Sequence, residues 1–306
     1  MQDSQIVNQG LIPPDFGISV SQARGAGMDA ISMFVLVVQS LLTLAFLPYQ
    51  TPIPFGHFRH PKLSDIEIVG SGADGPKAVV ETCRQMWALW ICPAAILKRF
   101  GRAVAADCEF GTVEGSALVI EGKFTFRGID TAVESSTAAI NGAVATVDVS
   151  RRDDSDELVP SGQSQLTDKT DSATIDFSAW PNIDLQDIVN PADNKPEFYT
   201  RIGNFGNPIP LHNIFGAIGQ AIIDRASKPA ASRSKVIPDY KFHPDAGGVV
   251  IEHHARHGSP EQPSYELVQH GLAFIAEMMG KRERFVEADF VMFHRDVPVV
   301  DGRIGM

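Results

Sequence analysis

The chain has 306 residues and a formal net charge of −11, with 44% hydrophobic and 21% charged residues. This length allows one large or two modest domains, and the composition is ordinary for a soluble globular protein. The acidic balance argues against a general nucleic-acid-binding surface, because such a surface needs basic side chains to neutralise phosphates. We therefore expect no nucleic-acid partner.

Three cysteines occur, at positions 83, 92 and 108. An odd and small number is not a disulfide framework. Cys83 and Cys92 fall in one predicted helix, where nine residues separate their Cα atoms by roughly 13 Å, too far for a disulfide. The cysteines therefore favour a reducing compartment, and we expect a cytoplasmic protein.

Residues 1–27 contain Gly, Pro, Gln and Asn without periodicity, so we expect an irregular N-terminal arm. The apolar segment Ala30–Leu47 follows and predicts a helix. Three interpretations of it stay open: a buried core helix, a membrane anchor, and a signal sequence that would direct secretion. Its length is at the lower limit for a membrane span, and the preceding segment lacks the positive region of a signal peptide. Its polar side chains share one narrow arc, which favours the core helix.

The remainder of the first half predicts an alternation of strands with one strong amphipathic helix. That helix begins at Pro76, shows one wide apolar face, and should end or kink at Pro93. A polar segment at 151–172, rich in charge, Ser, Thr and Gly, predicts a solvated linker. The expected elements are a strand at Asp65–Val69, the helix Pro76–Cys92, and strands at Ala103–Phe110, Ala117–Phe126 and Ala139–Val149.

The second half predicts a similar series of elements. A long Asn/Pro-rich loop leads to Pro210, and a second polar loop covers Ala230–Lys235. The expected elements are a strand at Ala173–Ala179, a helix at Leu211–Ala226, a strand at Gly248–His254, a helix at Ser264–Met279, and strands at Phe285–His294 and Val297–Ile304.

The two halves therefore predict the same unit twice: strand, helix, strand, strand, each preceded by a further helix. Similar residues occupy matching places, such as Val104–Asp107 beside Val286–Asp289 and Leu118–Phe124 beside Pro298–Ile304. Adjacent strands with short turns are antiparallel pairs, and one face of each is apolar. We therefore predict an internally duplicated α+β fold of helices on antiparallel sheets. The first repeat spans 28–150 and the second 173–306.

One candidate cofactor site is the segment Gly70–Gly75, which matches G-x-G-x-x-G through Gly70, Gly72 and Gly75. Between a strand and a helix, such glycines let the backbone approach a pyrophosphate. The acidic residue Asp107 lies some thirty residues further on instead of about twenty, and no series of βαβ units follows. A flexible turn is the alternative interpretation.

One candidate metal site is the segment His253–His257, which contains the histidines His253, His254 and His257. Imidazoles at close spacing can bind Zn, Cu or Ni. In a strand, however, His253 and His254 point to opposite faces, so only two of the three can converge easily. Ordinary imidazoles at a strand end are the alternative interpretation.

Two pairs of acids also occupy matching places: Asp107 with Asp289, and Glu121 with Asp301. Paired carboxylates can perform acid–base catalysis, but an acid before glycine is also common turn chemistry. Cys108 alternates with apolar positions, which favours a small buried side chain over a nucleophile.

The halves share packing residues but no set of convergent polar side chains. This favours a binding or assembly protein, with a protein partner or self-association. The alternative is an enzyme that uses a metal at His253–His257 or a nucleotide at Gly70–Gly75. A membrane tether through Ala30–Leu47 is a third possibility. The sequence identifies no substrate, cofactor or reaction.

Overall fold

The computed structural model describes residues 12–25, 27–60, 63–75, 78–129, 198–228, 240–242 and 248–306. This part of the chain contains four α-helices and three antiparallel sheets. The protein is therefore of the α+β class, as the sequence predicts.

The described first half contains two helices and seven strands. They are β1 (Phe16–Gln22), α1 (Ala30–Ala45), β2 (Pro52–Pro54), β3 (His57–His60), β4 (Leu63–Gly72), β5 (Val79–Glu81), α2 (Thr82–Phe100), β6 (Ala106–Glu114) and β7 (Ala117–Gly128).

The described second half contains two helices and five strands. They are β8 (Phe198–Gly203), α4 (Leu211–Ala226), β9 (Tyr240–Phe242), β10 (Val250–Ala255), α6 (Tyr265–Lys281), β11 (Ala288–His294) and β12 (Val297–Gly305).

The two large sheets have corresponding strand orders, β1-β6-β7-β4-β3 and β8-β11-β12-β10-β9. In both, one strand precedes a helix, two strands follow it, and a second helix leads to a hairpin. Strands β2 and β5 form a small additional sheet in the first half, which has no counterpart among the described strands of the second half. This correspondence agrees with the repeated order of elements in the sequence, while a common origin of the halves stays a prediction.

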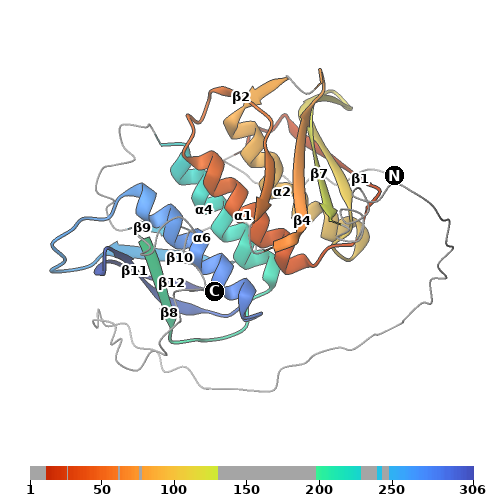
Figure 1. The fold of residues 1–306 in the computed structure, drawn as a ribbon. Helices are drawn as coiled ribbons and strands as arrows, with labels where there is room; N and C mark the ends of the chain where they lie inside the picture. The colour runs from red at the N-terminus through yellow and green to blue at the C-terminus, as the bar shows by residue number, and fades with distance from the viewer. Residues whose placement is uncertain are drawn as a thin grey trace, which may run out of the picture. The chain divides into compact units, whose positions relative to one another are not determined.

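The helices lie between the two large sheets (Figure 1). Helices α1 and α2 pack on the first sheet, and α4 and α6 pack on the second. Helix α1 also contacts α2, α4 and α6, so it lies at the centre of the helical layers. The core is continuous from one sheet through the helices to the other.

Helix α1 is a buried core helix, which is the interpretation of Ala30–Leu47 that its narrow arc of polar side chains favours. Asp29 caps its N-terminus by accepting a hydrogen bond from the Ser32 amide at 2.7 Å. Met33 and Leu41 are fully buried, and the polar side chain of Ser40 bonds to the Leu36 carbonyl at 2.7 Å. In the described part of the chain, no helix has the length and apolar character to cross a membrane.

Helix α2 differs from its predicted bounds at both ends. It begins at Thr82, not Pro76, because Val79–Glu81 forms β5 and pairs with β2. Pro93 lies inside the helix, which continues to Phe100. A proline inside a helix costs about 3 kcal/mol. Ile96, one turn after Pro93, is fully buried and contributes about 1.5–3 kcal/mol, which offsets much of this cost.

Two expected irregular segments contain strands instead. Residues 1–27 include β1, which pairs with β6, so the first half begins before position 28. Phe16 and Val20 point into the core and are 8% and 6% exposed. The expected loop before Pro210 contains β8, which pairs with β11. The predicted linker 151–172, the strands Ala139–Val149 and Ala173–Ala179, and the loop Ala230–Lys235 lie outside the described residues.

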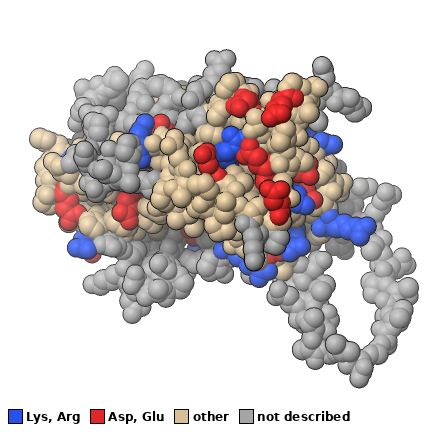
Figure 2. Space-filling view, turned by 90° about the horizontal axis from the view of Figure 1, so that it is seen from above, with Lys and Arg blue, Asp and Glu red and all other residues tan. Residues whose placement is uncertain are grey.

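Acidic and basic side chains are interspersed on the surface that Figure 2 shows. Several acidic side chains gather over one part of the described surface in this view, with basic side chains among and beside them. Charge-based recognition on the described part of this face is therefore local.

Candidate functional site

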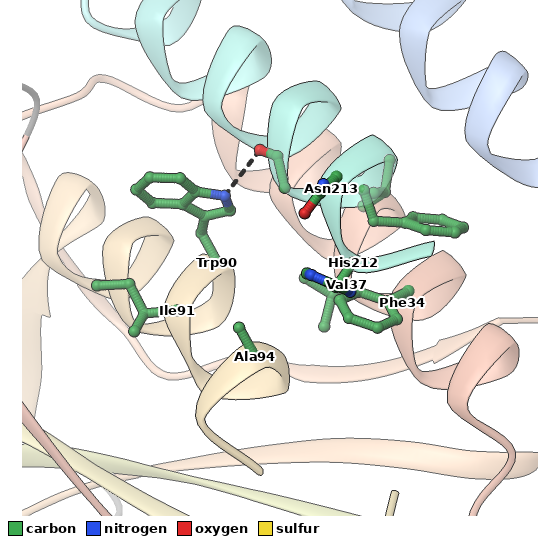
Figure 3. A pocket seen from close by; sticks show the side chains of 10 residues that line it. Phe34, Val37, Trp90, Ile91, Ala94, His212 and Asn213 are labelled. Atoms are coloured by element: carbon green, nitrogen blue, oxygen red, sulfur yellow. Dashed lines mark hydrogen bonds between the residues drawn. The ribbon is translucent and has the colours of Figure 1, made fainter. Parts of the chain in front are cut away.

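An apolar cavity of about 100 Å³ lies among helices α1, α2 and α4 (Figure 3). Both halves of the chain contribute to it, since α1 and α2 belong to the first half and α4 to the second. The lining residues are Phe34, Val37 and Val38 from α1, Trp90, Ile91 and Ala94 from α2, and His212, Asn213, Phe215 and Gly216 from α4.

One ring contact and one hydrogen bond join the helices that form the walls of this cavity. The Phe34 and Phe215 rings stack with centroids 5.1 Å apart, which joins α1 to α4. The Trp90 indole N–H donates to the Gly216 carbonyl at 2.9 Å, which joins α2 to α4. These contacts hold three helices around the space, so the cavity is a preformed feature of the packed protein.

Gly216 and Gly219 have different roles on the same face of α4. A Cβ at Gly219 would lie 2.8 Å from the Trp90 ring, so packing of Trp90 requires that glycine. A Cβ at Gly216 would meet nothing within 4 Å. A helical glycine costs about 0.5–1 kcal/mol relative to alanine. At Gly216 no neighbouring atom requires a glycine, although the residue is one of those that line the cavity.

Polar groups are confined to one part of the lining. His212 is exposed and lies in the first turn of α4, next to Asn213. Figure 3 shows both residues beside Phe34 and Val37 at the start of α4. The cavity therefore combines apolar walls with a small polar rim, which is the usual chemistry of a small-molecule site.

The predicted glycine site has a different context from a dinucleotide fingerprint. Gly70 and Gly72 lie within β4 and pair with Phe124 and Gly122 of β7. Gly75 lies in a turn with φ of 102°, and no helix begins there, because β5 precedes α2. A Cβ at Gly70 would lie 2.8 Å from the Phe55 ring, so packing requires that glycine. Nucleotide binding at these glycines stays a prediction without the expected strand-to-helix geometry.

The three predicted metal-binding histidines are in different environments. His253 points toward α4, is 2% exposed, and contacts buried Arg225 at 2.5 Å. Burial, followed by the charge of Arg225, lowers the pKa of His253 to about 2. His254 lies on the opposite face of β10, and His257 lies in an exposed turn. Within the described ranges, no three His, Cys, Asp or Glu side chains are placed to hold a metal.

The matched acids bind to separate structural partners. Asp107 accepts from Thr125 at 2.6 Å. Glu121 forms a two-point contact with Arg84 of α2, at 2.5 and 2.6 Å. These contacts attach helix or strand to sheet and do not bring the acids together.

The remaining members of these pairs follow the same pattern. Asp301 pairs with Arg256 at 3.0 Å, and Asp289 accepts from Asn204 at 3.0 Å. Cys108 is fully buried, as expected, and burial raises the pKa of its thiol well above the ordinary value. None of these groups lines the helical cavity.

The sequence did not identify the cavity, because its residues come from three segments that each resemble ordinary core helix. One local signal existed: α4 contains two glycines, at 216 and 219, within an otherwise amphipathic pattern. Comparisons with protein families, curated proteins and solved structures found no match to this chain.

Proposed function

We propose that this protein binds a small apolar molecule in the cavity among α1, α2 and α4. The observation that carries the proposal is Gly216, which lines the cavity and costs helix stability although no neighbouring atom requires a glycine there. Stability given up at one position is characteristic of functional sites.

The volume defines the class of ligand. In another protein, an engineered apolar cavity of about 150 Å³ stays dry and binds benzene. A cavity of about 100 Å³ with an open side therefore suits a single small ring or a short aliphatic chain. The polar rim at His212 leaves room for one polar group on the ligand, directed toward solvent.

This proposal specifies the binding function that the sequence favours. It also explains why the helices of the two halves meet: each half alone has a sheet with its helices, and α4 completes the walls that α1 and α2 begin. Ligand binding would therefore couple the halves by contacting both.

Isothermal titration calorimetry with toluene tests the proposal. The wild-type protein should bind toluene saturably, with one site per chain. Gly216→Leu should weaken binding about tenfold or more, because the leucine side chain occupies the cavity. Lys98→Leu is the matched control: it adds the same side chain to an exposed position of α2 and should bind like wild type. Absence of saturable binding, or equal affinity in Gly216→Leu, would contradict the proposal.

A further inference from the structure

A cluster of charged side chains lies on the face of the first sheet that points away from the helices. Glu67 is its centre and is only 3% exposed. The flanking residues Ile66 and Ile68 are buried in the core, so alternation along β4 places Glu67 on the outer face. Three basic side chains cover it: His57, Arg59 and Arg127, which are 49%, 50% and 47% exposed.

The register of three strands brings these groups together. Arg59 of β3 and Arg127 of β7 are both direct neighbours of Glu67 of β4. Arg59 Nη2 lies 2.6 Å from Glu67 Oε2, and Arg127 Nε lies 2.6 Å from Oε1. His57 Nε2 lies 2.7 Å from Oε2. Because both guanidinium groups touch one carboxylate, they lie side by side with a fixed orientation.

The arginines retain hydrogen-bonding capacity that these contacts do not use. An arginine side chain has five N–H donors. Arg127 uses Nε for Glu67, and among the described contacts its two terminal nitrogens have no partner. Arg59 uses Nε and Nη2, which leaves Nη1. Glu67 is buried beneath, while the arginine side chains are about half exposed, so a small solute can reach them.

An ion pair elsewhere on the same face of the sheet provides a comparison. Lys123 and Asp107 form one ion pair at 3.4 Å, with one cation for one acid. Around Glu67, two arginines and a histidine share one carboxylate. Two arginines on one carboxylate leave an excess of positive charge, which an anionic ligand can neutralise.

We propose that Arg59 and Arg127 form a binding site for a small oxoanion of the phosphate class, with Glu67 as the positioning residue beneath them. A tetrahedral oxoanion can accept hydrogen bonds from two adjacent guanidinium groups at once. Exposed Asp65 lies two residues before Glu67 on the same face and opposes anion binding by its charge. This site is separate from the helical cavity and does not depend on its ligand.

Titration of the full chain with inorganic phosphate at pH 7, followed by NMR, tests this site. Sodium chloride at matched ionic strength is the reference for nonspecific screening. We expect saturable phosphate binding, with shifts centred on β3, β4 and β7. Arg127→Gln and Arg59→Gln should each weaken it about tenfold or more, because each removes charge-assisted hydrogen bonds.

Two further variants distinguish specific binding by Arg59 and Arg127 from nonspecific attraction of phosphate to positive charge. Lys123→Gln removes one positive charge from the same face and should leave phosphate affinity within about twofold of wild type, since Lys123 does not touch Glu67. Asp65→Asn should tighten binding. The proposal is overturned if chloride produces the same shifts as phosphate, or if Lys123→Gln weakens binding as much as Arg127→Gln does. Two arginine variants are included so that a folding defect in one leaves the other as a test.

Discussion

Glu67 should give the protein an acid-dependent part of its stability. Burial alone would raise the pKa of this carboxyl group, but hydrogen bonds from His57, Arg59 and Arg127 outweigh burial and lower it from 4.5 to about 2. The folded-state pKa is therefore below the unfolded-state value. The stabilisation is fully present above about pH 4.5 and is lost as the pH falls toward 2.

The magnitude follows from the pKa difference. One pKa unit corresponds to about 1.4 kcal/mol, so the displacement gives an upper value of about 3 kcal/mol. The three basic side chains are about half exposed, and solvent screening reduces their contribution. We expect the carboxylate of Glu67 to contribute about 1–2 kcal/mol at neutral pH.

The perturbation is Glu67→Gln, which keeps the shape of the side chain and removes its charge. Urea unfolding of wild type and variant, followed by circular dichroism between pH 6 and pH 2.5, gives the free energy of unfolding at each pH. The difference should be about 1–2 kcal/mol at pH 6 and should shrink steadily below pH 4.5. Glu114→Gln, at an exposed strand end, should show no such convergence. A Glu67→Gln difference that stays constant down to pH 2.5 would refute the reasoning.

Three other predictions concern single positions. Glu283 follows α6 and Gly101 follows α2, and both have a positive φ, 50° and 71°, in the left-handed region that favours glycine. Glu283→Gly should therefore stabilise the protein by about 0.5–1 kcal/mol in urea unfolding, and Gly101→Ala should destabilise it by about 1 kcal/mol; the opposite signs would contradict this account. Burial lowers the pKa of His253 from 6.5 to about 2, so the unfolded chain takes up a proton that the folded chain excludes. Stability should fall by about 1.4 kcal/mol per pH unit below 6.5, and His253→Gln should remove this slope between pH 6.5 and 5; an unchanged slope would refute the assignment. Gly216→Ala should increase the free energy of unfolding by about 0.5–1 kcal/mol, and therefore raise the thermal midpoint, while it weakens toluene binding. A lower thermal midpoint would show that packing needs the glycine.

The long helices were predictable because their apolar periodicity is strong. Helix α4 has the predicted bounds, Leu211–Ala226, since Pro210 precedes an uninterrupted amphipathic pattern. For α2, the sequence predicts an end or a kink at Pro93, and the helix does not end there but continues to Phe100. Local sequence gives the cost of an internal proline, but the compensating burial of Ile96 depends on the core around α2, to which the distant helices α1 and α4 contribute.

The edge strands were not predicted, for two different reasons. In β1, the alternation of Phe16, Ile18 and Val20 was present but short, and Gly and Pro residues surround it. Strand β3 contains His57–His60, and no alternation of apolar side chains distinguishes it from a loop; its pairing with β4 determines the conformation. Short edge strands depend on their neighbours more than on their own sequence.

The candidate sites were beyond sequence analysis, because each forms from distant segments. The histidine and glycine motifs are contiguous in the sequence. His253 and His254 lie on opposite faces of β10, as the strand period predicts, whereas Gly70 and Gly72 lie within β4 and not in the expected strand-to-helix turn. The cavity needs three helices in place, and the cluster at Glu67 needs the register of three strands. Apart from Gly216 and Gly219 of α4, neither arrangement has a local sequence signal.

The most direct test of apolar ligand binding is a crystal structure of the wild-type protein exposed to toluene. We predict electron density for one toluene molecule per chain, between the rings of Phe34 and Trp90 and next to Gly216. The surrounding helices should keep their positions, because the cavity is preformed. A cavity that stays empty, or that neighbouring side chains fill while toluene binds elsewhere, would contradict the proposed function.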